Sequence, residues 1–450
     1  MLVNEIETTV SQKNTRPTKQ EAKILHFYHL PFEKGTKKLS LQTLNNHSAF
    51  RFLKRPYLLI RLRKISFNNE ILTLGIKFDN DQYEEQVYIK VQETELLVSC
   101  STNTNNQFLS RCAYFALYQL IGVYSEYDFE KFYWPGFFDA KTGKSKFLDI
   151  TNERADLEIV IKPKYSYFYK PGQTLTFPDQ DKMTARPQII KAENEINPSN
   201  DHAIGYCLAD TKLVSIHSPH FPFLVPYSGI WNKNKDGIKK FHRFITDSDL
   251  ESPYKYSAQQ KKLNDLSFKM MDLALIYGLK ESNSNKENEA IKRNNIKRMK
   301  DILGLWQKTM PLLEGQHFTH TFFTWGMSNV CGKPREKEMH SCTFSNGVPE
   351  ICFVLHDKGD YYELEFRFKI GNRIHIPNTL NPVFFISANT DPAKFYLLST
   401  ITDYHITHFF DKFKFRLSVL KNHYDGYFKD FVTHLASIYE IQYNGNKKHK

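Results

Sequence analysis

The stretch that decides the fold of the N-terminal part runs from Gln86 to Val123: QVYIKV at 86–91, ELLVSC at 95–100, STNTNNQFLS at 101–110 and RCAYFALYQLIGV at 111–123. In the first two segments apolar residues, β-branched ones among them, recur at every second position, which is the period of a strand. The last segment is rich in helix formers and apolar nearly all round, as in a helix buried against a sheet. The stretch therefore predicts a strand–strand–helix unit over residues 86–121.

The rest of the chain alternates between the same two patterns. Strands are expected at Tyr57–Arg63, Ile71–Phe78, Asp156–Lys162, Glu350–Leu355, Tyr361–Lys369 and Pro382–Ile386. Helices are expected at Ser257–Gly278 and Asn285–Leu313, and again from about Thr400 to Glu440. The sequence thus predicts an α+β protein of several small modules, with antiparallel sheets, packed helices and a central antiparallel helical pair.

Changes of pattern along the chain divide it into five predicted segments. They are a polar tail at 1–20, a β/α module at 21–139 that contains the 86–121 unit, a β-rich module at 140–254, the helical pair at 255–315 and an α+β C-terminal module at 316–450.

Composition describes an ordinary globular protein. The 450 residues include 61 Lys and Arg against 49 Asp and Glu, and 41% of them are hydrophobic. No apolar run approaches the ~20 residues of a membrane helix, and the polar N-terminus lacks the apolar block of a signal peptide. We therefore expect no membrane association and a cytoplasmic protein, with its six scattered cysteines reduced.

Motifs that carry catalysis are missing from the sequence or explained by turns. Lys141–Lys146 contains Gly-Lys-Ser, but Phe138 stands where a phosphate loop needs its first glycine, so we interpret it as a turn. The acids Asp357, Asp360 and Glu363 fall in and just after a predicted hairpin turn. The sequence thus predicts no catalytic residue, no enzymatic activity and no cofactor.

The order of elements in residues 86–121 resembles the SWIM zinc finger, a strand–strand–helix unit with Cys-x-Cys at the strand end and Cys-x-His at the helix start. The four corresponding positions hold Cys100, Thr102, Cys112 and Tyr114. Two thiolates alone do not complete a tetrahedral zinc site. The resemblance therefore implies a degenerate, metal-free finger that is held together by the packing of its helix. The side chains available for that packing are Phe115, Leu117, Leu120 and Ile121.

Further segments are similar to the region upstream of the motor in Bacteroidetes-type Swi/Snf-related proteins of helicase superfamily two. These segments are Asp156–Tyr165 with Lys170–Gly172, Phe223–Gly229, Asn232–Lys239, Tyr361–Phe366, Phe395–Ser399 and Leu417–Lys421. In that family the region leads into two RecA-like motor domains, and these 450 residues encode none. The resemblance implies a non-catalytic accessory module, and both a stand-alone protein and a piece of a longer chain stay open.

Positive charge is concentrated between Lys34 and Asn69, where no Asp or Glu occurs. Cations neutralise phosphates and aromatic rings stack on bases, and this segment mixes cations with Phe50, Phe52, Tyr57 and Phe67. The predicted nucleic-acid contacts are Arg51, Lys54, Arg55, Arg61, Arg63 and Lys64. The plainer explanation is that the last three, which alternate with apolar residues, form the solvated face of a half-buried strand.

The alternative function is docking on a protein partner, such as an ATPase motor or a polymerase supplied in trans. The helical pair offers a basic face made of Lys286, Lys292, Arg293, Lys297, Arg298 and Lys300. Its apolar residues Met270, Met271, Leu273 and Leu275 serve either a partner or internal packing. Nucleic-acid binding should weaken with salt, whereas an apolar protein complex should tolerate it.

Overall fold

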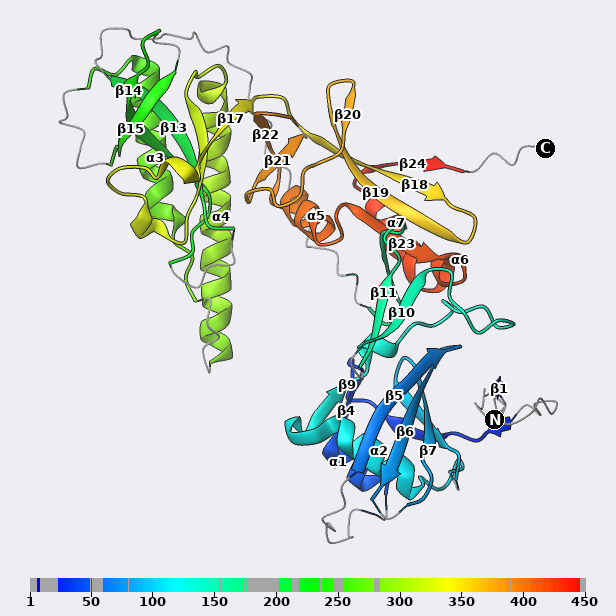
Figure 1. The fold of residues 1–450 in the computed structure, drawn as a ribbon. Coiled ribbons are helices and arrows are strands. Elements are labelled where there is room, and N and C mark those ends of the chain that lie inside the picture. Colours follow the sequence, from blue (N-terminus) through cyan, green and yellow to red (C-terminus); the bar gives the residue numbers. More distant parts are fainter. Residues whose placement is uncertain are drawn as a thin grey trace. The chain divides into compact units, whose positions relative to one another are not determined.

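The protein is an α+β assembly of several sheets and helices (Figure 1). The computed structural model describes residues 6–8, 23–48, 50, 60–79, 81–102, 104–153, 156–173, 175, 202–212, 218–234, 237–246, 254–278, 284–388 and 390–445. One compact unit consists of Met1–Leu175, Lys358–Tyr362 and Leu417–Thr433, and the other of Thr176–Asp357, Glu363–Arg416 and His434–Lys450. The segment boundaries that the sequence predicts at residues 139, 254 and 315 stay predictions.

The first unit is built on a five-stranded antiparallel sheet. In spatial order its strands are β3 (Tyr28–Pro31), β8 (Glu95–Cys100), β7 (Glu85–Val91), β6 (Ile71–Phe78) and β5 (Ile60–Asn68). Helix α2 (Arg111–Ile121) packs on one face of this sheet, where Leu72, Leu74 and Ile76 are fully buried. The predicted strand–strand–helix unit is confirmed as β7, β8 and α2.

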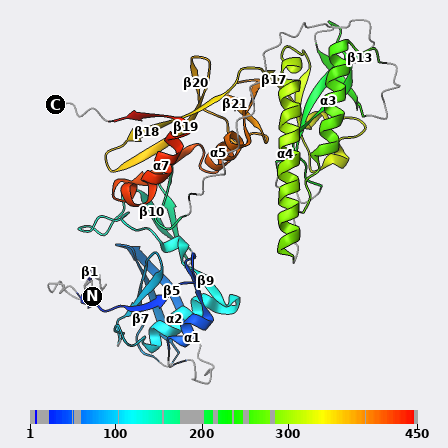
Figure 2. The ribbon, with the colours of Figure 1, turned by 180° about the vertical axis from the view of Figure 1, so that it is seen from behind.

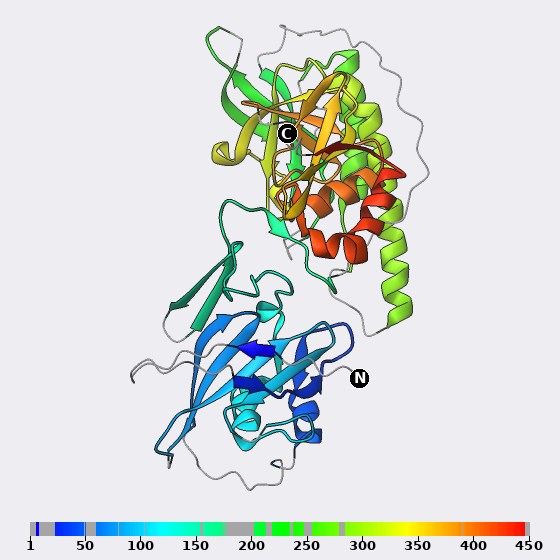
Figure 3. The ribbon, with the colours of Figure 1, turned by 90° about the vertical axis from the view of Figure 1, so that its right-hand side faces the viewer.

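Short elements complete the first unit. They are β1 (Ile6–Thr8) with β2 (Lys23–Leu25), β4 (Lys38–Ser40) with β9 (Glu126–Asp128), α1 (Leu41–Asn46), β10 (Leu148–Glu153) with β11 (Asp156–Ile161), β12 (Tyr167–Phe168) with β23 (Arg416–Leu420), α6 (Lys421–His423) and α7 (Lys429–Ala436). The hairpin of β10 and β11 lies beside the edge strand β5 (Figure 3).

The second unit contains a mixed seven-stranded sheet. In spatial order its strands are β15 (Ile238–Phe244), β14 (Phe223–Trp231), β13 (His202–Asp210), β16 (Thr319–Phe323), β17 (Met339–Ser345), β22 (Ala393–Leu397) and β21 (Phe385–Ala388). β13 and β16 are parallel, as are β17 and β22, and the other neighbours are antiparallel.

The predicted helical pair is confirmed as α3 (Ala258–Ala274) and α4 (Asn285–Leu313). Ser257 and Gln260 form a capping box that starts α3, and Ser284 caps α4. Gln259 Nε2 donates to the carbonyl of Leu312 at 2.7 Å, which joins the start of one helix to the end of the other and shows that they are antiparallel.

The two halves of α4 have different surroundings. Trp306 in the second half is fully buried and donates its indole N–H to the carbonyl of Pro222 at 2.9 Å. The first half projects past α3 (Figures 1 and 2), and most of its side chains between 285 and 297 are exposed. Among the described helices, none is long and apolar enough to cross a membrane.

The remaining elements of the second unit correct two expectations. They are β18 (Glu350–Asp357) with β24 (Glu440–Asn444), β19 (Tyr361–Ile370) with β20 (Arg373–His375), and α5 (Ile401–Asp411). β21 begins at Phe385 rather than Pro382, because the Phe385 N–H bonds to the Pro382 carbonyl in a turn. The helical prediction from Thr400 to Glu440 is wrong at β23, where buried Leu417 and Val419 alternate in a strand.

Candidate nucleic-acid interface

The structure describes three of the six cations predicted to contact nucleic acid. Arg61, Arg63 and Lys64 lie on β5, the edge strand of the first sheet, whereas Arg51, Lys54 and Arg55 lie outside the described residues. Ile60 and Leu62 pack against the core, so Arg61 and Arg63 point to the opposite, solvated face. This alternation agrees with the interpretation of these cations as the solvated face of a half-buried strand.

Two of these three cations are neutralised by carboxylates. Arg63 donates to Glu84 in a bidentate ion pair, with Nε–Oε2 at 2.8 Å and Nη2–Oε1 at 2.6 Å. Lys64 pairs with Asp156 of β11 at 2.5 Å, and this hydrogen bond lowers the pKa of Asp156 to about 2. Only Arg61 among the three is exposed without a partner in the described part of the chain.

The aromatic part of the prediction is wrong at Phe67 and stays a prediction at Phe50. A β-bulge between Lys64 and Ser66 changes the face on which later residues of β5 lie. Phe67 is therefore turned into the core, where it is 1% exposed. Phe50 is half-buried and its ring lies 6.1 Å from that of Tyr114. The Phe67 ring therefore cannot stack on a base.

Three of the four positions that correspond to zinc ligands in the resemblance to the SWIM finger lie close together. Cys100 ends β8, Cys112 lies in the first turn of α2, and the hydroxyl of Thr102 lies 3.4 Å from the first sulfur and 3.9 Å from the second. Ser110 caps α2 and fixes where that turn begins. Tyr114 instead donates its hydroxyl to Asn45 Oδ1 at 2.8 Å and is buried in the core.

The chemistry of this cluster is that of thiols. No group of three or more His, Cys, Asp or Glu residues with metal-binding geometry occurs among the described residues. The hydrogen bond from Cys112 lowers the pKa of Cys100 below its ordinary value, and raises that of Cys112. Leu117 and Ile121 of α2 are buried in the core of the unit.

A second basic surface, on α4, has more exposed charge than β5. Five cations recur there at spacings of three, four, seven and eight residues, which place them along one side of a helix. This α4 stripe consists of Lys286, Arg293, Lys297, Lys300 and Lys308, all exposed. Residues 291–300 contain five cations and no acid, and of the stripe Lys286, Lys297 and Lys308 form no ion pair within the described ranges.

The stripe runs into an open groove of about 550 Å³ between α3 and α4. Its lining residues are Lys269, Asp272, Leu273, Lys300, Asp301, Gly304, Leu305 and Lys308. A Cβ atom on Gly304 would have no neighbour within 4 Å, so the missing side chain leaves this part of the helix surface open. Three ammonium groups against two carboxylates make the groove a weakly basic continuation of the stripe.

The sequence prediction missed part of this surface and misread another part. Lys269 and Lys308 were not recognised, although Lys308 follows Lys300 by eight residues and Gly304 lies between them. Arg298 was assigned to the basic face, but its guanidinium lies 4.7 Å from the Tyr277 ring and within 3.5 Å of the carbonyls that end α3. Arg298 thus links the two helices.

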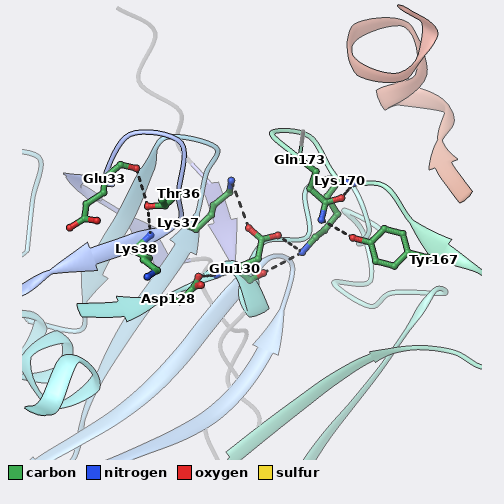
Figure 4. A network of polar contacts seen from close by, with 9 residues as sticks. All are labelled: Glu33, Thr36, Lys37, Lys38, Asp128, Glu130, Tyr167, Lys170 and Gln173. Atoms are coloured by element: carbon green, nitrogen blue, oxygen red, sulfur yellow. Dashed lines mark hydrogen bonds and ion pairs between the residues drawn. The ribbon is translucent and has the colours of Figure 1, made fainter. Parts of the chain in front are cut away.

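A third cationic cluster is buried in the first unit (Figure 4). Glu130 lies between Lys37 and Lys170, with N–O distances of 3.9 Å and 2.8 Å. The two lysine side chains are 7% and 8% exposed, and burial lowers the pKa of Lys170 below its ordinary value. Their ammonium groups lie over the rings of Tyr133 and Trp134, 4.2 Å and 4.4 Å from the centroids.

This cluster joins three separate segments rather than offering a surface. Lys37 comes just before β4, Glu130 follows β9, and Lys170 follows β12. Gln173 accepts from the Lys170 backbone N–H at 2.9 Å and donates to the Tyr167 hydroxyl at 2.8 Å. Lys37 belongs to the acid-free segment of the sequence, but the fold removes it from any polyanion site.

Comparisons with protein-family models, with curated proteins and with solved structures return no match to this chain.

Proposed function

We propose that this protein is a non-catalytic accessory module that binds nucleic acid through the α4 stripe. The observation that carries the proposal is the run of exposed cations from Lys286 to Lys308, which spans about 33 Å at 1.5 Å per residue. A duplex presents one phosphate charge per ~1.7 Å of its axis, so several of these cations can meet phosphates at once.

The same observation moves the site away from the one predicted on β5. Ion pairs occupy Arg63 and Lys64 in the free protein, and a phosphate would have to displace Glu84 or Asp156 to reach them. The α4 stripe requires no such exchange at Lys286, Lys297 or Lys308. Arg51, Lys54, Arg55 and Arg61 stay predicted nucleic-acid contacts.

The resemblance to the region upstream of a Swi/Snf-type motor supports an accessory role and stays a prediction. It also keeps a protein partner as the alternative, since Leu273 and Leu305 give the groove an apolar component. An acidic helix laid between α3 and α4 would use the apolar and the cationic lining residues together.

The test is a titration of fluorescent single-stranded and duplex DNA and RNA with the whole chain at two salt concentrations. The interface variant is Arg293→Glu/Lys297→Glu/Lys300→Glu. The matched control is Lys141→Glu/Lys144→Glu/Lys164→Glu, which reverses three exposed lysines of the first unit. Each variant lowers the net charge by six, from +12 to +6.

We expect steep weakening of binding with salt for the wild type and the control. The interface variant should bind duplex DNA more weakly than the wild type. The slope of its log affinity against log salt concentration should be less steep by about three times 0.9, because three phosphate contacts are lost. Equal loss in both variants would show that only net charge matters, and would refute the site. Absence of binding at low salt in the wild type would refute the function and favour the protein partner.

A further inference from the structure

Two cysteine thiols meet at the junction between β8 and α2. Cys100 is buried at the end of the strand, and Cys112 is half-exposed in the first turn of the helix. The Thr102 hydroxyl contacts both sulfurs, at 3.4 Å and 3.9 Å. Among the six cysteines of the chain, Cys331 is instead exposed on the surface.

We propose that Cys100 and Cys112 form a redox-active dithiol, which a peroxide such as hydrogen peroxide converts into a reversible disulfide. The placement of the sulfurs carries this inference. They come from two elements that pack against each other, and one hydroxyl group, that of Thr102, contacts both of them. The inference is independent of nucleic-acid binding.

The reaction balances in two steps. The Cys100 thiolate attacks one peroxide oxygen, the O–O bond breaks, and Cys100 sulfenic acid and hydroxide are formed. The Cys112 sulfur then attacks the sulfenic sulfur, which forms the S–S bond and expels the hydroxyl as water after proton transfer from the Cys112 thiol. Two electrons pass from the dithiol to the peroxide. A small dithiol, such as dithiothreitol, reverses the modification by thiol–disulfide exchange.

The local environment assigns the two roles. The Cys112 thiol and the Thr102 hydroxyl both hydrogen-bond to the Cys100 sulfur, and these bonds favour its thiolate form. Cys112 keeps its proton until the second step and is the resolving residue. A peroxide molecule is little larger than water, which suits a thiol that is largely buried.

Tryptic mapping of the whole chain tests the proposal directly. Trypsin cleaves after Arg111 and so separates the two cysteines, because the nearest other cleavage sites are Lys90 and Lys131. After treatment with a small excess of hydrogen peroxide, peptides 91–111 and 112–131 should be found joined, with the mass about 2 Da below their sum. Dithiothreitol should release them. Cys331→Ser is the control and should not change this result.

The order of the steps is tested with two single variants. With Cys112→Ser, the sulfenic acid cannot be resolved, and dimedone should label peptide 91–111. With Cys100→Ser, peptide 112–131 should remain largely unlabelled. Thr102→Val keeps both thiols and should slow disulfide formation.

Two results would overturn the proposal. One is that both wild-type peptides stay separate and fully alkylated after Cys331 has been oxidised. The other is that disulfides to Cys331 form as readily as the link between the two peptides, which would indicate unspecific oxidation. Both results come from the wild-type chain, so a variant that fails to fold does not weaken the test.

Discussion

Replacing Glu130 with glutamine removes the carboxylate that Lys37 and Lys170 share. At an effective dielectric constant of about 20, the charges attract by about 4 kcal/mol at 3.9 Å and by about 6 kcal/mol at 2.8 Å. Much of this is offset in the wild type by desolvation of the three groups, and the Glu130 side chain is 41% exposed, so water screens it further.

The expected loss of folding stability lies between two limits. Breaking an exposed ion pair costs about 1 kcal/mol at most, and breaking a buried pair costs about 3–5 kcal/mol. We expect Glu130→Gln to lower the free energy of unfolding of the first unit by about 2–3 kcal/mol. Lys170→Met should lower the free energy of unfolding by about 1 kcal/mol or less, because Glu130 still pairs with Lys37 and the methionine side chain fills the space beside Trp134. The double variant should be more stable than Glu130→Gln alone, since it carries one unpaired ammonium fewer.

The pH dependence follows from the lowered pKa of Lys170. Without Glu130 the pKa of Lys170 in the folded protein falls further, whereas in the unfolded chain Lys170 has its ordinary pKa of 10.5. In the window below 10.5 the unfolded state therefore binds more protons, and stability rises with pH. The deficit of Glu130→Gln relative to the wild type should shrink as the pH approaches 10.5.

Hydrogen exchange with mass spectrometry in increasing urea provides the assay on the whole chain. Peptides of residues 60–134 report the first unit, and peptides of 319–345 report the second and serve as an internal control. If Lys170→Met costs as much as Glu130→Gln, or if the double variant is the least stable of the three, the reasoning about an unpaired buried charge is refuted.

Two further predictions concern a core position and a buried histidine. Phe67→Ala should destabilise the first unit by about 3–5 kcal/mol, because Phe67 is buried. Arg61→Ala, on the other face of β5, should change the free energy of unfolding by no more than about 0.5 kcal/mol. If urea unfolding gave similar values for the two variants, the bulge could not place the two side chains on opposite faces. Burial lowers the pKa of His220 from 6.5 to about 4, so the unfolded state binds more protons between these values, and stability present above pH 6.5 is lost as the pH falls toward 4. The contribution is about 2 kcal/mol between pH 8 and pH 5 and about 3 kcal/mol by pH 4, from 1.36 kcal/mol per pKa unit. His220→Phe should remove that part of the acid destabilisation in urea titrations of the second unit, and an unchanged pH profile would refute it.

The parts of the fold that local signals determine could be predicted from the sequence. Apolar residues recur at every second position in β6, β8 is a short apolar run, and α4 starts at a serine cap, so their bounds agree with the structure. β23 could not be predicted, because it is a short strand that pairs with β12, about 250 residues earlier in the chain. A strand that is specified by a distant partner leaves little trace in its own residues.

The site shows the same division between local and distant causes. The order strand–strand–helix and the clustering of Cys100 with Cys112 follow from spacing along the chain. The neutralisation of Lys64 depends on Asp156, which is 92 residues away, and the orientation of Tyr114 depends on Asn45, which is 69 residues away. A count of charges in one segment cannot show which of them the fold pairs.

The way the first unit is assembled from separate stretches has a consequence for protein synthesis. Leu175 ends its first stretch and Thr433 its last, so 258 residues are translated between them. β23, the partner of β12, follows it by about 250 residues, so at about 5–20 residues per second the ribosome needs about 12–50 seconds to supply it. During that time β12 has no strand to pair with, while nearly all of the second unit emerges from the ribosome. A chaperone that shields this nascent edge would raise the yield of native protein more than one that acts after release.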